Sequence, residues 1–240
     1  MSIRKFIKRA LGDELLGALD YYRHPQKRNY CGGPFNGQVF RKKIFMELIQ
    51  NIQFTAIVET GTYRGTTTDY LHCASRLPVY TVERNARCVG FAKARFLTNR
   101  NIKISYDDSR SFLQRVVAEP WCRGQHVFFY LDAHWGADLP LAEELEIIFK
   151  SVDSASVMVD DFSVPGDDGY GFDGYGDGKV LNLGYLEQVR VQLQLAVFFP
   201  SERAEMESGS RRGCVILVRD AHMVEKMANM QTIRRHFGST

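Results

Sequence analysis

Short apolar runs alternate with stretches of helical spacing from residue 54 onward. Seven of these runs have the length of buried strands: residues 55–59, 79–83, 102–105, 127–132, 156–160, 193–199 and 214–218. They are apolar throughout rather than alternating, which is typical of strands that helices cover on both faces. Four stretches with apolar residues at helical spacing separate the first five runs, at 66–74, 86–97, 109–117 and 139–150. Strands that alternate with helices of this length predict βαβ units and a parallel sheet.

The rhythm changes after residue 160. A loop rich in glycine and aspartate comes first, then a helical stretch at 181–192, then the last two strands with no helix between them. We therefore expect an α/β, Rossmann-like fold, with a seven-stranded, mostly parallel sheet that ends in an antiparallel hairpin. Residues 1–50 read as helix, turn-rich loop and helix, which predicts a helical N-terminal extension ahead of a main domain at 51–240.

Composition narrows the class of protein without naming a function. The chain has 240 residues, 45% of them hydrophobic and 25% charged, as expected for one globular α/β domain. It has no run of about 18 apolar residues, so we expect no membrane span. The net charge is only +3, and no basic stripe with interleaved aromatics is present, which argues against a nucleic-acid partner. The five cysteines are scattered and never form a CxxC pair, which favours a reducing, cytoplasmic setting over a disulfide framework or a zinc site.

The strongest local motif follows the first predicted strand. That strand ends in Glu59, and the chain then turns through Gly61 and Gly65 into a helix. Glycines let the backbone approach a ligand closely, and the first amides of a helix are free donors. A dinucleotide site would have the spacing G-x-G-x-x-G, whereas Gly61 and Gly65 have the spacing G-x-x-x-G. A carboxylate here would repel the pyrophosphate of a dinucleotide, but it would attract the cationic amino group of S-adenosylmethionine. A tight strand–helix turn without a ligand is the structural alternative. The candidate cofactor-binding residues are Glu59, Thr60, Gly61, Thr62, Tyr63, Gly65, Thr66 and Thr67.

Two further acidic positions fit an adenosine ligand. Glu83 ends the next strand, 22 positions beyond Gly61, where an acidic residue can accept hydrogen bonds from both ribose hydroxyls; Arg84 follows it. NAD sites use the same device, so Glu83 does not choose among nucleotides. Asp108 and Ser109 follow the third strand, and they could contact the adenine amino group or simply cap the helix that begins there.

Three aspartates end the fourth and fifth strands: Asp132, then Asp160 and Asp161. Functional sites of open α/β sheets lie at the carboxyl ends of strands, so these carboxylates should converge beside the glycine motif. Crowded carboxylates raise one another's pKa values, and a hard divalent cation such as Mg²⁺ relieves the repulsion by taking oxygen ligands. In the alternative reading, Asp160 or Asp161 caps a loop and Asp132 binds the cofactor alone.

Taken together, these motifs resemble the macrocin O-methyltransferase family, over roughly residues 35–165. The topology resembles that of class I methyltransferases, which implies the cofactor S-adenosyl-L-methionine. The family acts on sugar hydroxyls of natural products, which implies a small-molecule acceptor. The resemblance further implies that Asp132, Asp160 and Asp161 bind Mg²⁺. It also implies that residues 51–240 form the catalytic domain, and that residues 34–38 of the N-terminal extension close over the cofactor. The chain departs from the family at Ala133 and His134, where Gly and Asp are more common.

For the chemistry, methyl transfer requires removal of the hydroxyl proton of the acceptor. His134 lies two residues beyond Asp132 and has an ordinary pKa near working pH, so it is our first choice as general base, with Asp132 as the other candidate. The loop at 163–179 carries Tyr170, Phe172 and Tyr175, which could stack on an acceptor ring beneath a mobile lid. The alternatives left open are a catechol-type aromatic O-methyltransferase, a Rossmann-fold oxidoreductase or other nucleotide-binding protein, and a non-catalytic binding protein; a homo-oligomer also stays open.

Overall fold

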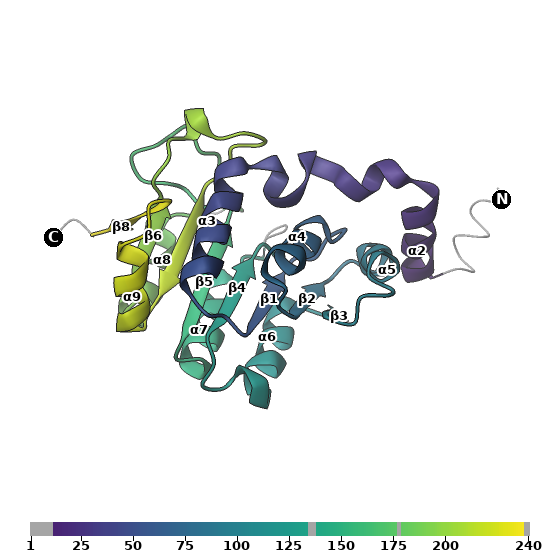
Figure 1. Cartoon of the computed structure of the whole chain (residues 1–240), viewed down its shortest axis with the longest axis horizontal. Helices are drawn as coiled ribbons and strands as arrows, with labels where there is room; N and C mark the ends of the chain where they lie inside the picture. Colours follow the sequence, from purple (N-terminus) through teal and green to yellow (C-terminus); the bar gives the residue numbers. More distant parts are fainter. Residues whose placement is uncertain (1–11, 134–137, 177–178, 238–240) are drawn as a thin grey trace.

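The computed structural model describes residues 12–133, 138–176 and 179–237. Within these residues, one mixed sheet has the strand order β3-β2-β1-β4-β5-β7-β6-β8 (Figure 1). The strands are β1 Ala56–Thr60, β2 Val79–Glu83, β3 Ile102–Tyr106, β4 Val127–Leu131, β5 Ala155–Asp160, β6 Ala196–Pro200, β7 Cys214–Val218 and β8 Ile233–His236. The helices are α2 Asp13–Arg23, α3 Val39–Asn51, α4 Thr66–Ser75, α5 Ala86–Arg95, α6 Ser109–Ala118, α7 Leu141–Ser151, α8 Leu183–Gln192 and α9 Ala221–Ala228.

The first five strands are parallel, and the later ones are antiparallel. β1 lies between β2 and β4, with Ile57 beside Val79 and beside Phe128. β7 runs antiparallel between β5 and β6, with Asp160 opposite Cys214. The predicted α/β fold with a terminal antiparallel hairpin is therefore confirmed, and its parallel strands all end at one edge.

Three differences from the sequence prediction concern the C-terminal region. The structure adds an eighth strand, β8, at the edge of the sheet; its Ile-Arg-Arg-His sequence carries too little apolar character to be recognised, because only Ile233 is buried. The helix α9 before it was also missed. The sixth strand begins at Ala196 rather than at residue 193, because the chain turns at Gln194 with a φ of 56°.

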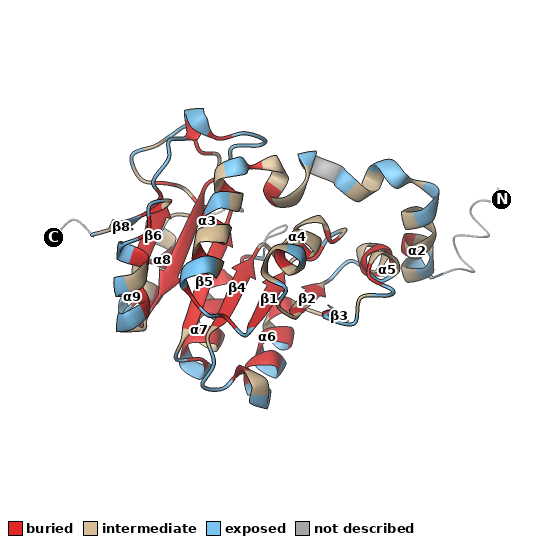
Figure 2. Cartoon of the chain, in the orientation of Figure 1, coloured by how far each residue is buried: buried red, intermediate tan, exposed pale blue. Residues whose placement is uncertain are grey.

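Helices cover both faces of the sheet, as the continuous apolar strands predicted. Alternate residues of β4 point to opposite faces: Phe129 packs with α6, α7 and α8, whereas Phe128 packs with α3, α4 and α9. Figure 2 shows the resulting burial: the central strands β1, β4, β5 and β7 are buried between two partly exposed helical layers, whereas the edge strands β3 and β8 are partly exposed. Among the described residues, none of the helices combines the length and the apolar character that a bilayer crossing requires.

The N-terminal segment crosses the molecule before it joins the sheet. α2 lies against α5 through two glycines: a Cβ on Gly17 would meet the carbonyl oxygen of Arg87 at 1.9 Å, and one on Gly90 that of Glu14 at 1.7 Å. Two 3₁₀ helices, η1 (Pro25–Gly32) and η2 (Pro34–Gly37), then lead to α3, whose inner face is part of the core (Figure 1). We call residues 24–38 the arm.

Candidate functional site

The glycine turn after β1 is pressed against the ends of β2 and β4. Gly61 has a φ of +90°, and a Cβ there would lie 2.3 Å from the carbonyl oxygen of Asp132, so no other residue fits without a shift of the backbone. The amides of Gly61 and Thr62 both donate to the carbonyl of Val82 at 3.0 Å. The predicted tight turn is therefore present, and it sets the ends of three neighbouring strands at close range.

Glu59 is a buried carboxylate at the centre of this edge. It is 1% exposed, and its Oε2 accepts hydrogen bonds from the hydroxyls of Thr68 at 2.5 Å and Thr81 at 2.7 Å. Burial raises the pKa of Glu59 to about 7, which means that the ionised form lacks a counter-charge. A cationic group placed beside Glu59 would restore the ionised form.

Several of the predicted loop residues have structural partners. The hydroxyl of Thr66 donates to the carbonyl of Arg28 at 3.1 Å, and that of Thr67 accepts the amide of Phe35 at 3.2 Å, so both hold the arm. Thr62 shares a 2.5 Å hydrogen bond with Thr81. The hydroxyl of Thr60 is buried and has no hydrogen-bond partner among the described residues.

Glu83 at the end of β2 is held in place by backbone amides. Its Oε2 accepts from the amide of Tyr63 and its Oε1 from that of Asn85, both at 2.7 Å. A carboxylate fixed in this way at the end of the second strand retains lone pairs for two ribose hydroxyls. The adjacent Arg84 is exposed.

Asp108 is the N-cap of α6, one of its two predicted roles. Its Oδ1 accepts the amide of Arg110 at 3.0 Å and the Nε of the same arginine at 3.1 Å, and these bonds lower the pKa of Asp108. Ser109 beside it is buried. Glu144, which was not among the predicted residues, is a fully buried carboxylate on α7; burial raises its pKa to about 7, and the Ser109 hydroxyl opposes this rise only in part. Its position between Leu141 and Leu145 on the apolar face of α7 was the available signal.

The three aspartates do converge at the ends of β4 and β5. The amide of Asp132 donates to the carbonyl of Thr60 at 3.0 Å, which places Asp132 beside the glycine turn. Burial, together with the charges of Asp160, Asp161 and Glu59, raises the pKa of Asp132 well above its usual range. Four carboxylates therefore share one edge of the sheet, as the strand-end pattern predicted.

Two arginines that the sequence analysis did not single out lie against the aspartate pair. Arg41 of α3 forms an ion pair with Asp160, and both side chains are 1% exposed. The Tyr130 hydroxyl donates to the other oxygen of Asp160 at 2.5 Å. Arg212 donates through its Nε to Asp161 at 2.6 Å and also pairs with Asp173 of the following loop.

This arrangement does not fit the predicted Mg²⁺ site. Both oxygens of Asp160 already accept protein donors, since Oδ1 also takes the amide of Asp161 at 2.8 Å. In the part of the chain that the structure describes, no group of three or more His, Cys, Asp or Glu side chains could hold a metal ion. The predicted general base His134 lies outside the described residues.

The loop after β5 folds back onto Asp161. The amide of Asp173 donates to the carbonyl of Asp161 at 3.0 Å, and the hydroxyl of Tyr175 donates to the carboxylate of Asp173 at 3.2 Å. Phe172 is exposed, but Tyr170 is 2% exposed and its hydroxyl donates to the carbonyl of Glu202. The interpretation of Tyr170 as an acceptor-stacking side chain is therefore wrong, because its ring is already packed in the core.

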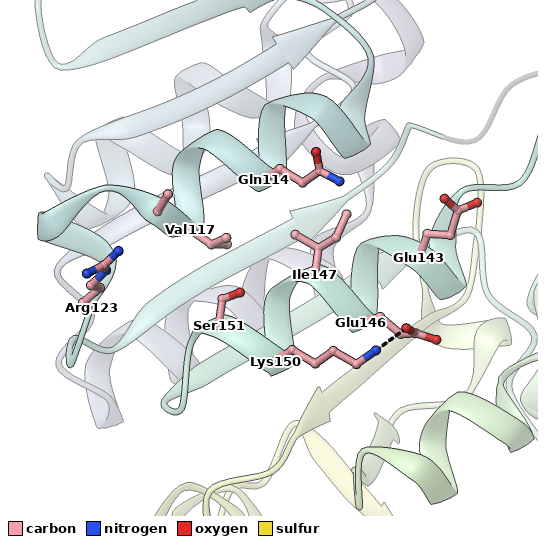
Figure 3. Close-up of a pocket in the computed structure, with 9 residues that line it drawn as sticks. Gln114, Val117, Arg123, Glu143, Glu146, Ile147, Lys150 and Ser151 are labelled. Atoms are coloured by element: carbon pink, nitrogen blue, oxygen red, sulfur yellow. Dashed lines mark hydrogen bonds and ion pairs between the residues drawn. The ribbon is translucent and has the colours of Figure 1, made fainter.

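A groove of about 680 Å³ lies elsewhere, on the outer side of α6 and α7 (Figure 3). Gln114, Ile147 and Lys150 line it, and Lys150 is paired with Glu146, which lies one turn earlier on α7. None of the sequence-predicted site residues lines this groove. It is a surface feature between two helices rather than the site at the strand ends.

Comparison with known proteins identifies the fold. No protein-family model matches the chain, and no curated protein matches it at a significant level. Among solved structures, the O-methyltransferase from Bacillus cereus in complex with SAH has a TM-score of 0.58 at 16% identity, over 88% of this chain and 92% of that one. The O-methyltransferase TomG from Streptomyces achromogenes, involved in tomaymycin synthesis and solved with SAM, has a TM-score of 0.56 at 14% identity, over 88% and 91%. The SAH-bound methyltransferase PaMTH1 from Podospora anserina has a TM-score of 0.53 at 11% identity, over 88% and 89%. The chain thus has the Rossmann-like methyltransferase fold.

Proposed function

We propose that this protein is an S-adenosylmethionine-dependent O-methyltransferase acting on a hydroxyl of a small molecule. The observation that carries the proposal is Glu59, a buried carboxylate without a counter-charge beside a glycine turn that only glycine can form. A ligand with a cationic amino group satisfies this carboxylate, and a pyrophosphate would be repelled by it. The similarity of fold to methyltransferases solved with SAM or SAH supports the same conclusion.

The cofactor would lie along the ends of β1, β2 and β3. In this proposal Glu59 faces the amino group, Glu83 accepts the ribose hydroxyls, and the segment at Asp108 and Ser109 borders the adenine. The fixed position of Glu83 supports its assignment, because a carboxylate that is already oriented loses little conformational entropy on binding.

The acceptor would lie next to Asp132, between the cofactor and the loop that follows β5. Asp132 is the proposed proton acceptor among the described residues, and His134 remains the other candidate for this role. A carboxylate crowded by other carboxylates binds a proton more readily than an isolated one, which suits a general base. A sugar hydroxyl of a natural product is the proposed acceptor, as the resemblance to sugar O-methyltransferases implies. Mg²⁺ is not part of the proposed mechanism, because both oxygens of Asp160 accept protein donors and Arg212 pairs with Asp161.

Transfer of a radiolabelled methyl group tests this function. The protein is incubated with methyl-labelled S-adenosylmethionine and, in separate reactions, with panels of sugar-bearing natural products and of catechols. We expect label to be transferred to a sugar hydroxyl, and transfer to catechols alone would replace the sugar acceptor by the aromatic one. If S-adenosylmethionine neither binds nor donates its methyl group to any panel, the proposed function is wrong.

A further inference from the structure

Two arginines from distant parts of the chain meet at the aspartate pair. Arg41 lies in the first turn of α3 and Arg212 lies just before β7, and the Nη2 of Arg41 donates to the carbonyl of Arg212 at 2.6 Å. Gln38 completes the junction: its Nε2 donates to the same carbonyl at 2.8 Å, and its Oε1 accepts the amide of Arg212 at 3.1 Å. The Arg41 guanidinium and the Gln38 side chain are therefore both bonded to the backbone of Arg212.

Each arginine forms an ion pair with one aspartate of the pair. Arg41 pairs with Asp160 and Arg212 with Asp161, and Arg212 reaches onward to Asp173. A guanidinium is a permanent cation that binds a carboxylate through directed donors. Mg²⁺ needs a nearly octahedral set of oxygen ligands at about 2.0–2.1 Å, and two fixed positive charges beside the carboxylates would repel it.

The position of Arg41 is fixed by its surroundings and not only by Asp160. The carboxylate of Glu207 accepts the amides of Phe40 and Arg41 at 3.0 and 3.1 Å, which anchors the start of α3. The Arg41 side chain is 1% exposed, so it has no solvent route away from Asp160. A cation arriving from solvent would have to displace a buried ion pair.

Arg212 also links the end of β5, through Asp161, to the loop that follows this strand, through Asp173. Its side chain runs along the backbone of Gly171, where an added Cβ would lie 3.2 Å from Nη1, and ends at Asp173. The same loop is bonded to Asp161 through the amide of Asp173. Arg212 thus fixes the loop on the acceptor side of the site.

We propose that this site uses no divalent cation: Arg41 and Arg212 supply the counter-charge to the aspartate pair, and Arg212 is a positioning residue for the acceptor-side loop. The inference rests on the proposed function only where it describes the loop as lying on the acceptor side of the site. The ion pairs and their consequence for metal binding do not depend on which reaction the site performs.

Titration with Mn²⁺, followed by the loss of its free-ion electron paramagnetic resonance signal, tests this inference on the full chain. Wild type, Arg212→Gln and Arg212→Lys are compared, each with and without SAH. We expect no saturable Mn²⁺ binding by wild type or by the lysine variant, which keeps the positive charge. The glutamine variant leaves Asp161 and Asp173 without a cation and should bind Mn²⁺ saturably, which neither wild type nor the lysine variant should do. Mere loss of structural support would not produce such a gain.

Saturable Mn²⁺ binding by wild type, abolished by Asp161→Asn, would overturn the inference. So would a glutamine variant that gains no affinity although its SAH binding shows it to be folded. If that variant does not fold, the wild-type titration and a chelator experiment still decide. The inference requires that the rate of methyl transfer in excess EDTA equals the rate in Mg²⁺. A rate about 100-fold or more lower in EDTA would refute it, because removal of a main electrostatic stabiliser has an effect of that size. SAH binding is measured in the same samples, so failure of the proposed function is seen separately from failure of the metal inference.

Discussion

Substitution of Arg41 by methionine gives the sharpest test of the buried ion pair. Methionine keeps the unbranched shape but removes the guanidinium, so the Asp160 carboxylate loses its counter-charge while both positions stay buried. Breaking a buried pair by removing one partner typically costs about 3–5 kcal/mol of the free energy of unfolding. For a chain of this size each kcal/mol lowers Tm by about 2–4 °C, so we expect a decrease of about 6–20 °C.

The assay is urea denaturation followed by circular dichroism, with the slope of the transition checked for each variant. Arg219→Met is the matched control, because Arg219 pairs with an exposed partner, Asp153, at 3.1 Å. Exposed pairs contribute about 0–1 kcal/mol, so the control should barely move. The double variant Arg41→Met, Asp160→Asn should regain part of the loss, because no buried charge is left unpaired. If Arg41→Met behaves like the surface control, the ion pair does not have the burial and the charge on which the metal inference depends.

Three further predictions concern Glu59, the glycine turn and the buried Glu144 of α7. Below about pH 7 protonation removes the charge of Glu59 in the free protein, so calorimetric titrations should show SAH affinity falling by up to about tenfold per pH unit. An affinity that is constant from pH 6 to 8 would contradict the role of Glu59 in binding the amino group. Gly61→Ala should abolish SAH binding or folding, because the new Cβ would lie 2.3 Å from a carbonyl oxygen. Gly124→Ala is the control: it is also at positive φ but has nothing within 4 Å, so it should lower the free energy of unfolding by only about 1–2 kcal/mol. Equal effects would show that crowding at Gly61 is unimportant. The folded-state pKa of Glu144 is raised to about 7, so stability is lost as the pH rises from the ordinary pKa of a glutamate through 7. Glu144→Gln should therefore stabilise the protein by about 2–3 kcal/mol at pH 8 and hardly at pH 4. No gain at pH 8 would mean that the carboxylate has a partner that offsets its burial.

The sheet could be predicted because its signal is local. Buried parallel strands need continuous apolar runs: β4 is Val-Phe-Phe-Tyr-Leu, and β1 and β5 contain Ala-Ile-Val and Val-Met-Val ahead of their polar ends. Because parallel strands end at one edge, the convergence of Glu59, Asp132 and Asp160 also followed from position alone. β8 escaped because an edge strand of four residues with two arginines has no apolar pattern.

The partners of the carboxylates could not be predicted in the same way. Arg41 and Asp160 are 119 residues apart in the chain, and Arg212 and Asp161 are 51 apart, so their pairing depends on packing that no local pattern encodes. One indication was present for Arg41, which lies three and four positions before Ile44 and Phe45 on the buried face of α3. An arginine on an apolar face requires a buried anion, and the strand-end aspartates were the available candidates. The threonines at 66 and 67 were assigned to a ligand because the contact of the arm with them was likewise invisible in the sequence.

Isothermal titration calorimetry of the wild-type chain with SAH, S-adenosylmethionine and NAD⁺ is the most direct measurement. If the carboxylates at the ends of β1 and β2 form the site of a nucleoside with a cationic amino group, SAH and S-adenosylmethionine bind with one-to-one stoichiometry and NAD⁺ does not. Glu59→Gln then weakens SAH by about 10- to 150-fold, the equivalent of one charge-assisted hydrogen bond of about 1.5–3 kcal/mol. Binding of NAD⁺ without binding of SAH, or SAH affinity unchanged in Glu59→Gln, would contradict this assignment of the site.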